Sequence, residues 1–537
     1  MIGRRATDRT PLARVVGEID YAYTHGRYAR ARELLERNLI AGWFGLAPER
    51  FAEIVSDLSR SDEPPGALLQ ILALMLSKRS GGDDGSRDAV PERSLDADAA
   101  VVEMGGALGM DSSLIEQLRR SGGEQGVPVT SLVQLLHMFT LRLEGRPKQA
   151  MRVIGALEQH LGSMETVLDR SRGWTLFIAV QHGITAMLAG DLSAALASFT
   201  RARMQRYAPE HGFLVRDACL KSAIIEVLYG DVERARALLV EAEDVIRTES
   251  WVEAANDAAQ RLVETFVLSE TPDDALGLLD RVPMRDFGEL WPFYIVAVQQ
   301  LLADAGRVEE SDARFALFDT LALPRVLGEG FNGSAFALCR YANALASGNL
   351  EEARENLAEA DGDLVVTRLA IAVQDLLSGR PREAQQRVAG LRQETRGLRM
   401  LDVYRLSVLA GSHLALGEEE ECAEVLGFVL RLPGGPRPRE LAAFTSEVRA
   451  FAETRFAAWP SLPGWAERFS FDVRPVLTER ELEILGELAA GRSREQIAQA
   501  EFISMNTLKT HLRSLYRKLG VRSRTGAVLE GERRGLL

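Results

Sequence analysis

The sequence predicts an all-α protein, with an array of paired helices followed by a small C-terminal domain of four helices. Three observations support this fold class. Hydrophobic residues make up 46% of the 537 residues and aromatic residues only 7%, while Ala, Leu, Arg and Glu are abundant, which favours helices. A glycine and a small residue recur at a fixed spacing along the chain. Helix-capping residues precede amphipathic segments near the C-terminus.

The recurring pattern is a glycine followed five positions later by a small residue. Its copies are Gly26…Ala31, Gly145…Ala150, Gly190…Ala195, Gly230…Ala235, Gly306…Ser311, Gly348…Ala353, Gly379…Ala384 and Gly417…Cys422, with a degenerate copy at Thr271 to Ala275. Each copy follows one apolar helical segment and opens another. We therefore expect the glycine to end the first helix in the left-handed conformation. The small residue should let the second helix pack closely against the first.

One such helix pair cannot bury its own apolar faces, so neighbouring pairs must stack. The pattern resembles a loose, lengthened tetratricopeptide repeat, which implies a superhelix whose concave surface is lined mainly by the first helix of each pair. The alternative is an ordinary helical bundle with coincidental glycines. We place the repeats at 131–455, after an irregular N-terminal helical cap at 10–130. The cap contains a polar, Gly-rich loop at 77–95 that is expected to be flexible, and a second break spans 121–129.

The stretch at 456–473 contains prolines and a glycine and is interpreted as a linker to a C-terminal domain at 474–537. Two capping boxes are expected to start helices in this domain, at Thr478 with Glu481 and at Ser493 with Gln496. The first of these helices places three leucines on one face and should end at Gly491. Ser504 is expected to cap a third helix.

The third helix of the C-terminal domain is predicted to be strongly amphipathic. Leu508, Leu512, Leu515 and Leu519 form one apolar stripe. The opposite side is polar and basic and carries Asn506, Lys509, Thr510, Arg513 and Arg517. A helix with such a face can enter the major groove of DNA. Gly520 should end this helix, and a fourth helix should run from about Arg524 to Arg534.

Charge is distributed unevenly along the chain. The formal net charge is −13, but residues 490–524 hold eight basic and two acidic side chains, a net +6, which leaves −19 for the remainder. An acidic body with a basic C-terminal segment is typical of a nucleic-acid-binding domain joined to a separate body.

The C-terminal domain resembles the helix-turn-helix of the LuxR family of bacterial regulators. The residues that carry the resemblance are Leu477, Thr478, Arg480, Glu481, Gly491, Ser493, Ile497, Ala498, Ile503, Ser504, Thr507, Lys509, His511, Lys518, Leu519 and Arg524. The resemblance implies a transcriptional regulator that binds double-stranded DNA, as a homodimer at least on DNA. It implies base contacts by Lys509, Thr510 and Arg513. It implies phosphate contacts by Ser504, Asn506, Thr507 and His511, with Arg517 and Lys518 as further basic candidates.

Two positions depart from the LuxR pattern. Glu501 stands next to the turn where the family usually has leucine, and a buried carboxylate there would be costly. Either Phe502 supplies the packing or Glu501 reaches solvent. Gly526 stands where the family usually has an acidic or amide residue, which would loosen the start of the fourth helix, used for dimerisation in the family.

Helical repeats joined to a LuxR-type domain resemble the C-terminal part of large ATP-dependent regulators of the MalT type. The ATPase module is not part of the resemblance, because the sequence has no G-x-x-x-x-G-K-[ST] loop. The repeats are expected to bind an effector, a small molecule in preference to a protein partner. The candidate residues are Trp174, Arg216, Asn256, Trp291, Tyr294, Arg340, Arg368, Tyr404 and Arg405.

Other function classes receive little support from the sequence. Cys219, Cys339 and Cys422 are far apart in apolar helical segments, which predicts core positions and neither a disulfide framework nor a zinc site. Catalytic and cofactor motifs are not found, and His182 and His211 stand alone. The sequence has no apolar run long enough to span a membrane, so a cytoplasmic protein without membrane contact is expected. One further alternative is an interaction scaffold whose helix-turn-helix no longer binds DNA.

Overall fold

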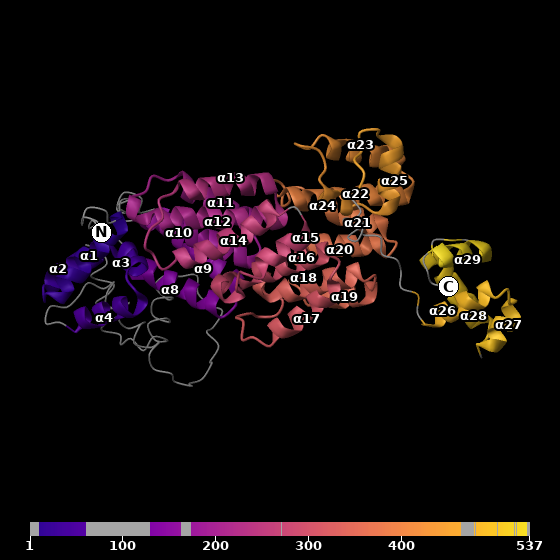
Figure 1. Ribbon diagram of the computed structural model, residues 1–537, viewed down its shortest axis with the longest axis horizontal. Coiled ribbons are helices and arrows are strands. Elements are labelled where there is room, and N and C mark those ends of the chain that lie inside the picture. Colours follow the sequence, from indigo (N-terminus) through magenta and orange to yellow (C-terminus); the bar gives the residue numbers. More distant parts are fainter. Residues whose placement is uncertain are drawn as a thin grey trace, which may run out of the picture.

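The computed structural model describes residues 10–60, 129–162, 173–269, 271–462, 477, 479–501, 503–519, 521, 523–533 and 537. Within these ranges every regular element is a helix, so the predicted all-α class is confirmed (Figure 1). Several sequence predictions fall outside the described residues, namely the loop at 77–95, most of the break at 121–129, the linker residues 463–473, Thr478, Phe502 and Gly520.

Among the described residues, four helices precede the repeats: α1 (Pro11–Thr24), α2 (Tyr28–Arg37), α3 (Leu39–Gly45) and α4 (Pro48–Ser59). The first copy of the glycine pattern lies between α1 and α2. Gly26 has φ +67°, and Ala31 is fully buried. Phe44 of α3 packs against Phe177 and Phe213 of the repeats. The N-terminal helices therefore share one continuous apolar core with the array.

Eight further helix pairs follow in chain order. They are α8 (Val129–Leu143) with α9 (Pro147–Gly162), α10 (Trp174–Ala189) with α11 (Leu192–Met204), α12 (Gly212–Tyr229) with α13 (Val232–Asp244), α14 (Glu253–Leu268) with α15 (Pro272–Leu279), α16 (Trp291–Asp304) with α17 (Val308–Asp319), α18 (Gly330–Ala346) with α19 (Leu350–Ala358), α20 (Val365–Leu377) with α21 (Pro381–Ala389), and α22 (Arg399–Leu416) with α23 (Glu419–Leu430). Short 3-10 helices, η2 (Pro209–His211) and η3 (Met284–Leu290), precede α12 and α16.

The predicted helix-ending role of the repeated glycines is confirmed at seven of the eight copies, where φ lies between +67° and +89°. It is wrong at Gly230, whose φ is −116°. There the Glu226 carboxylate accepts a hydrogen bond from the backbone N–H of Asp231 at 2.8 Å. A Cβ at Gly230 would clash with that carboxylate, so a larger residue would require Glu226 to move.

The small residue of each copy is fully buried, as predicted. The eight side chains with no exposed surface are Ala31, Ala150, Ala195, Ala235, Ser311, Ala353, Ala384 and Cys422. The degenerate copy also forms a helix, because the Thr271 side chain accepts from the N–H of Asp274 and caps α15. A larger side chain at these positions would push the two helices of a pair apart.

The first helices of the pairs form the interior of the array. Every residue of α12 is buried. α10 contacts α18, and α12 contacts α22, although several helix pairs separate them in the chain. Lys148 of α9 forms ion pairs with Asp361 at 2.9 Å and with Asp363 at 2.8 Å. The sequence predicts an open concave surface lined by the first helices, and this prediction is wrong along α10 and α12. Nearly every residue of α10 and every residue of α12 is buried, including Arg216 and Glu226 of α12, so both helices are covered on all sides.

A segment after α23 ties the end of the array back to its middle. It contains α24 (Pro438–Ala442), close to the helix start expected near Arg439, and leads to α25 (Ser446–Arg455). Arg437 pairs with Asp231 of the α12–α13 turn at 2.9 Å. Arg439 pairs with Asp304 of α16 and lies over the Phe266 ring of α14 at 5.3 Å.

The three cysteines are free and buried, which confirms the core role predicted for them. Burial raises the pKa of the Cys219 thiol to about 12, so the unreactive thiol form persists at neutral pH. Among the described residues, no helix combines the length and apolar character needed to cross a lipid bilayer.

Candidate nucleic-acid interface and pocket

The C-terminal helices are α26 (Glu479–Ala489), α27 (Arg494–Ala500), α28 (Met505–Leu519) and α29 (Arg524–Arg533). Figure 1 shows them as a group of their own beyond the repeats. The predicted leucine stripe of α28 is confirmed, because Leu508, Leu512, Leu515 and Leu519 are at most 4% exposed. Leu485 and Leu488 of α26 are buried in the same core, whereas Leu482 is only partly buried. Ile484 is buried there too, and the sequence reasoning missed it.

Within the described residues, the helix ends of this domain are capped as predicted. Ser493 and Gln496 form the expected capping box at the start of α27. Ser504 accepts from the backbone N–H of Thr507 at 3.1 Å and caps α28. Gly491 has φ +80° just after α26. These caps fix where α27 and α28 begin, and therefore how far α28 projects.

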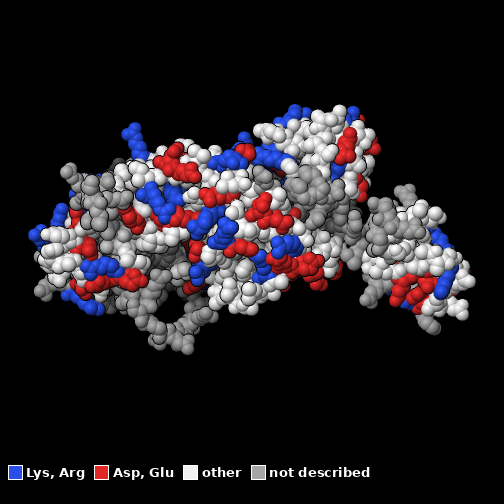
Figure 2. Space-filling view, in the orientation of Figure 1, with Lys and Arg blue, Asp and Glu red and all other residues white. Residues whose placement is uncertain are grey.

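One side of α28 is exposed, polar and basic. The visible face of the repeats, by contrast, carries acidic and basic side chains interspersed (Figure 2). Asn506, Lys509, Thr510 and Arg513 are all exposed. Since successive helical residues are about 100° apart, these four lie within roughly a third of the helix circumference, opposite the leucines. Lys509 and Arg513 make no ion pair with the described residues, and α28 contains no acidic residue. This face can therefore accept phosphates or base edges without first breaking a salt bridge.

The remaining predicted DNA contacts differ in their surroundings. Ser504 and Thr507 join their hydroxyls at 2.8 Å, so both serve the helix cap. His511 is half-buried beside the exposed face. Of Arg517 and Lys518 only the backbone is described, so their predicted roles remain predictions.

Glu501 does not reach solvent, which was one of the two outcomes expected from the sequence, and the other outcome, packing by Phe502, lies outside the described residues. The Glu501 side chain is only 13% exposed and forms an ion pair with Arg480 of α26. Arg480 also donates to the backbone carbonyl of Glu501 and pairs with Glu483 at 2.8 Å. Hydrogen bonding to Glu483, with the charge of Glu501 adding to it, raises the pKa of Arg480. One guanidinium therefore clamps the turn between α27 and α28.

Replacing Arg480 with leucine is expected to destabilise the C-terminal domain, because the Glu501 carboxylate, only 13% exposed, loses its partner. Hydrogen exchange of the α27 and α28 amides in the full chain measures this loss. Arg480→Leu combined with Glu501→Leu should recover most of it. Glu483→Gln, which removes only the exposed partner, serves as the control and should be nearly neutral. Unchanged protection in Arg480→Leu would show that the clamp is not structural.

The start of α29 is held more firmly than the sequence suggested. The Ser523 hydroxyl accepts a hydrogen bond from the backbone N–H of Gly526 at 3.0 Å, so Ser523 caps α29. A Cβ at Gly526 would lie 3.2 Å from the Ser523 hydroxyl. Arg524 donates to the carbonyl of Leu488 at 2.7 Å and joins α29 to the end of α26. Gly526 therefore fits the closely packed start of α29, and the expected loosening of this helix start is not seen.

The candidate effector residues Arg216 and Asn256 lie together in the closed interior. Arg216 is 6% exposed and pairs with Glu253 and, at 3.2 Å, with Asp257. Asn256 donates to Glu253 at 3.4 Å. Burial works against ionisation of Asp257, but Arg247 and Arg216 hold the pKa of Asp257 below its ordinary value. The Arg216 guanidinium is thus already occupied by protein partners.

The aromatic candidates occupy core positions. Trp174 is 7%, Trp291 1% and Tyr294 6% exposed. Trp291 lies 5.8 Å from the Phe336 ring. Arg340 lies 5.7 Å from the same ring and pairs with Asp319. These contacts indicate packing, and the structure does not bring the aromatic candidates together around a shared cavity.

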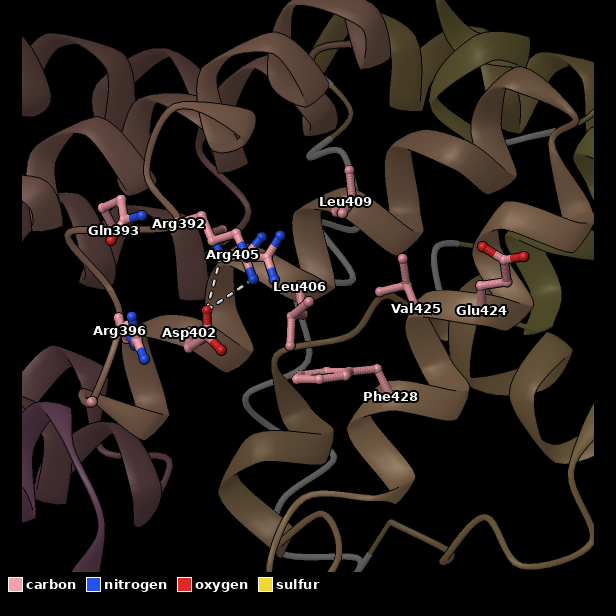
Figure 3. Close-up of a pocket in the computed structure, with 11 residues that line it drawn as sticks. Arg392, Gln393, Arg396, Asp402, Arg405, Leu406, Leu409, Glu424, Val425 and Phe428 are labelled. Carbon is pink, nitrogen blue, oxygen red and sulfur yellow. Dashed lines mark hydrogen bonds and ion pairs between the residues drawn. The ribbon is translucent and has the colours of Figure 1, made fainter.

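The last three candidates lie near the end of the array. Arg368 contacts both carboxylate oxygens of Glu394 at 2.7 Å. Tyr404 is half-buried. Arg405, only 8% exposed at its side chain, donates to Asp402 at 2.9 Å and lines a pocket between α22, α23 and residues 392–397 (Figure 3). The pocket has a volume of about 680 Å³, within the ordinary range for small-molecule sites.

Comparisons with known proteins agree with the C-terminal geometry. The family described as "Bacterial regulatory proteins, luxR family" matches residues 475–530. The nitrate/nitrite response regulator protein NarP of Escherichia coli is 57% identical over 54 residues, which are 10% of this chain and 25% of NarP. The CsgBAC operon transcriptional regulatory protein of the same species is 48% identical over 61 residues, 11% of this chain and 28% of that protein.

A larger relative matches through the same region. The HTH-type transcriptional regulator MalT of Yersinia pestis is 46% identical over 57 residues, 11% of this chain and 6% of MalT. The matches therefore span about a quarter of the two shorter relatives and a small fraction of MalT. They concern the helix-turn-helix and carry no information on the repeats.

Proposed function

We propose, from the LuxR-type helix-turn-helix domain at residues 475–530, that the chain is a DNA-binding transcription regulator. The observation that supports this most is the acid-free helix α28, which exposes Asn506, Lys509, Thr510 and Arg513 on one side. A helix with that face is suited to the major groove of double-stranded DNA. The relatives NarP, MalT and the CsgBAC operon protein are regulators by name, which supports the same function.

The proposed contacts divide into two kinds. Lys509, Thr510 and Arg513, all exposed on α28, are proposed to read base edges, as the resemblance of the domain to the LuxR family implies. Phosphates are contacted by the flanking polar and basic residues Ser504, Asn506, Thr507, His511, Arg517 and Lys518. Phosphate contacts position the protein, and base contacts specify the sequence.

The chain is proposed to act as a dimer on a two-fold DNA site, in the cytoplasm. Two copies would place their α28 helices in successive major grooves, about one helical turn apart. The proposed organisation is an N-terminal cap at 10–130, repeats at 131–455, a linker at 456–473 and the DNA-binding domain at 474–537.

An effector in the repeat domain is proposed to control DNA binding, a small molecule in preference to a protein. The pocket beside Arg405 supports the small molecule, because it is a concave site with both charged and apolar walls. The protein-partner alternative rests on the exposed apolar side chains of the α17–α18 connection, where Leu321 is 45% and Leu327 73% exposed.

Selection of bound sequences from random duplexes, using the full-length chain, tests the proposed function. We expect enrichment of a two-fold symmetric site. Affinity for that site should fall linearly on a log–log plot against salt, with a slope of roughly −0.9 for each phosphate contacted. Recovery of no enriched sequence at low salt would favour the scaffold alternative, in which the helix-turn-helix no longer binds DNA.

A further inference from the structure

The pocket at the end of the array combines arginines that are unpaired among the described residues with an exposed aromatic side chain. Arg392 and Arg396 are exposed at its edge and make no ion pair with any described residue. Phe428 of α23 lines the same pocket and is 46% exposed. Arg368, by contrast, pairs with Glu394. The pocket therefore presents uncompensated positive charge beside uncovered apolar surface.

A third arginine is held in place by the protein. The Arg405 side chain is 8% exposed, and its Nε and one terminal nitrogen both contact Asp402 at 2.9 Å. Asp402 also accepts from the Thr395 hydroxyl at 3.0 Å. These contacts fix the guanidinium in one orientation and balance its charge. A ligand would therefore meet net positive charge from Arg392 and Arg396 and a preorganised donor at Arg405.

The two ends of the pocket differ in chemistry (Figure 3). The arginines lie on one side, with Asp402 between them. Leu406 and Phe428 line the middle, and Val425 and Glu424 lie on the far side. Glu424 would repel a negative charge placed near it. An anionic group is therefore directed to the arginine side, and an apolar group fits against Leu406 and Phe428.

We propose that this pocket binds an amphipathic anion, with a carboxylate or phosphate head at Arg392, Arg396 and Arg405 and an aliphatic body against Leu406 and Phe428. The inference deepens the proposed effector control and rests on it, because it names the place and the chemical class of the effector. A volume of about 680 Å³ accommodates a head group with a chain of moderate length.

Isothermal titration of the full-length chain with decanoate and with decyl phosphate tests the proposal and separates the two head groups. Decyltrimethylammonium has the same tail and the opposite charge, and inorganic phosphate has the head alone. We expect at least one decyl anion to bind about tenfold more tightly than decyltrimethylammonium and inorganic phosphate, because both parts of the pocket are used. Equal affinity for decyltrimethylammonium, or no binding of either decyl anion at millimolar concentration, overturns the proposal. The second result would also favour a docked protein.

Variants locate the binding. Arg396→Gln should weaken binding of the preferred anion about tenfold, the usual effect of losing one charge-assisted hydrogen bond. Phe428→Ser removes an exposed apolar wall and should weaken it by a similar factor. Arg382→Gln on α21 is the matched control, since Arg382 is exposed, makes no ion pair with the described residues and does not line the pocket. Equal binding by Arg396→Gln and the unmodified chain would place the anion elsewhere and overturn the assignment.

The same preparations distinguish failure of the pocket from failure of the proposed function. Affinity for the selected DNA duplex is measured with and without the preferred decyl anion. We expect the anion to change this affinity in the unmodified chain but not in Arg396→Gln. Arg396-dependent binding without any effect on DNA would support the pocket and contradict effector control. Normal DNA binding without anion binding would contradict the pocket alone.

Discussion

Lys509→Ala is expected to weaken binding to the preferred DNA site by about 1–3 kcal/mol and to relax sequence preference at one base position. Lys509 is exposed on α28, between Asn506 and Arg513, and makes no ion pair with the described residues. Its ammonium group is thus available to a base edge, where one good contact gives discrimination of this size. Arg513→Ala should have an effect of similar magnitude at a different base position.

Quantitative gel shifts with the preferred duplex and with a scrambled duplex measure this effect. The ratio of the two affinities should fall in both variants, since base contacts carry the specificity. Arg152→Ala is the control for loss of one positive charge, because Arg152 is exposed on α9 and makes no ion pair with the described residues. If neither Lys509→Ala nor Arg513→Ala alters the ratio, α28 is not the recognition helix.

Arg216→Met is expected to destabilise the repeat array by about 3–5 kcal/mol, the usual cost of removing one partner from a buried ion pair. Glu253 would remain in the interior, with a side chain only 4% exposed and without its cationic partner. The hydrogen bonds that Glu253 accepts from the Thr248 N–H and hydroxyl at 3.1 Å keep the carboxylate in place. The charge therefore cannot turn to solvent without disrupting the local structure.

Urea unfolding followed by the helical circular dichroism signal measures this loss. Arg216→Met with Glu253→Gln should recover a large part of the stability, because the second change removes the uncompensated charge. The exposed i,i+3 pair between Arg30 and Glu33 provides the control, and Arg30→Met should cost less than about 1 kcal/mol. A stable Arg216→Met variant that fails to respond to effector would instead support the effector role predicted from the sequence.

The local parts of the fold could be predicted from the sequence because their causes are local. A glycine in the left-handed conformation and a small buried residue need only the two helices they join. The same holds for the Ser493 and Ser504 caps and for the leucine stripe of α28, whose spacing alone fixes one buried face. The polar face of α28 follows from the same geometry. The candidate DNA-contact residues on that face therefore follow from helical spacing together with the family resemblance.

The failures share one cause, which is contact through side chains that no local pattern reveals. Glu226 displaces the expected conformation at Gly230 through a side-chain hydrogen bond that spacing does not indicate. The Glu501 carboxylate forms an ion pair with Arg480, which lies 21 positions earlier, and no pattern in the turn indicates this contact. Arg216 had the polarity of a ligand-binding residue, but the carboxylates that occupy it come from the following repeat.

The pocket escaped the sequence analysis for a related reason. Arg392 and Arg396 follow α21, Arg405 lies in α22 and Phe428 in α23. Only the turn between α22 and α23 brings Phe428 opposite the arginines. Arg405 was singled out as a polar residue in a first helix, whereas Arg392 and Arg396 lie in a connection that the repeat pattern treats as a spacer.

The closed interior of the array limits how this protein can change over evolution. In an open solenoid each repeat touches only its neighbours, so whole repeats can be gained or lost. Here Lys148 meets Asp361, and Arg437 meets Asp231, across several intervening repeats. Insertion or loss of one pair would move both sets of partners out of register and expose the faces of α10 and α12. Descendants of this chain should therefore keep the number of helix pairs constant and vary mainly in the connections, one of which carries Arg392 and Arg396 of the pocket.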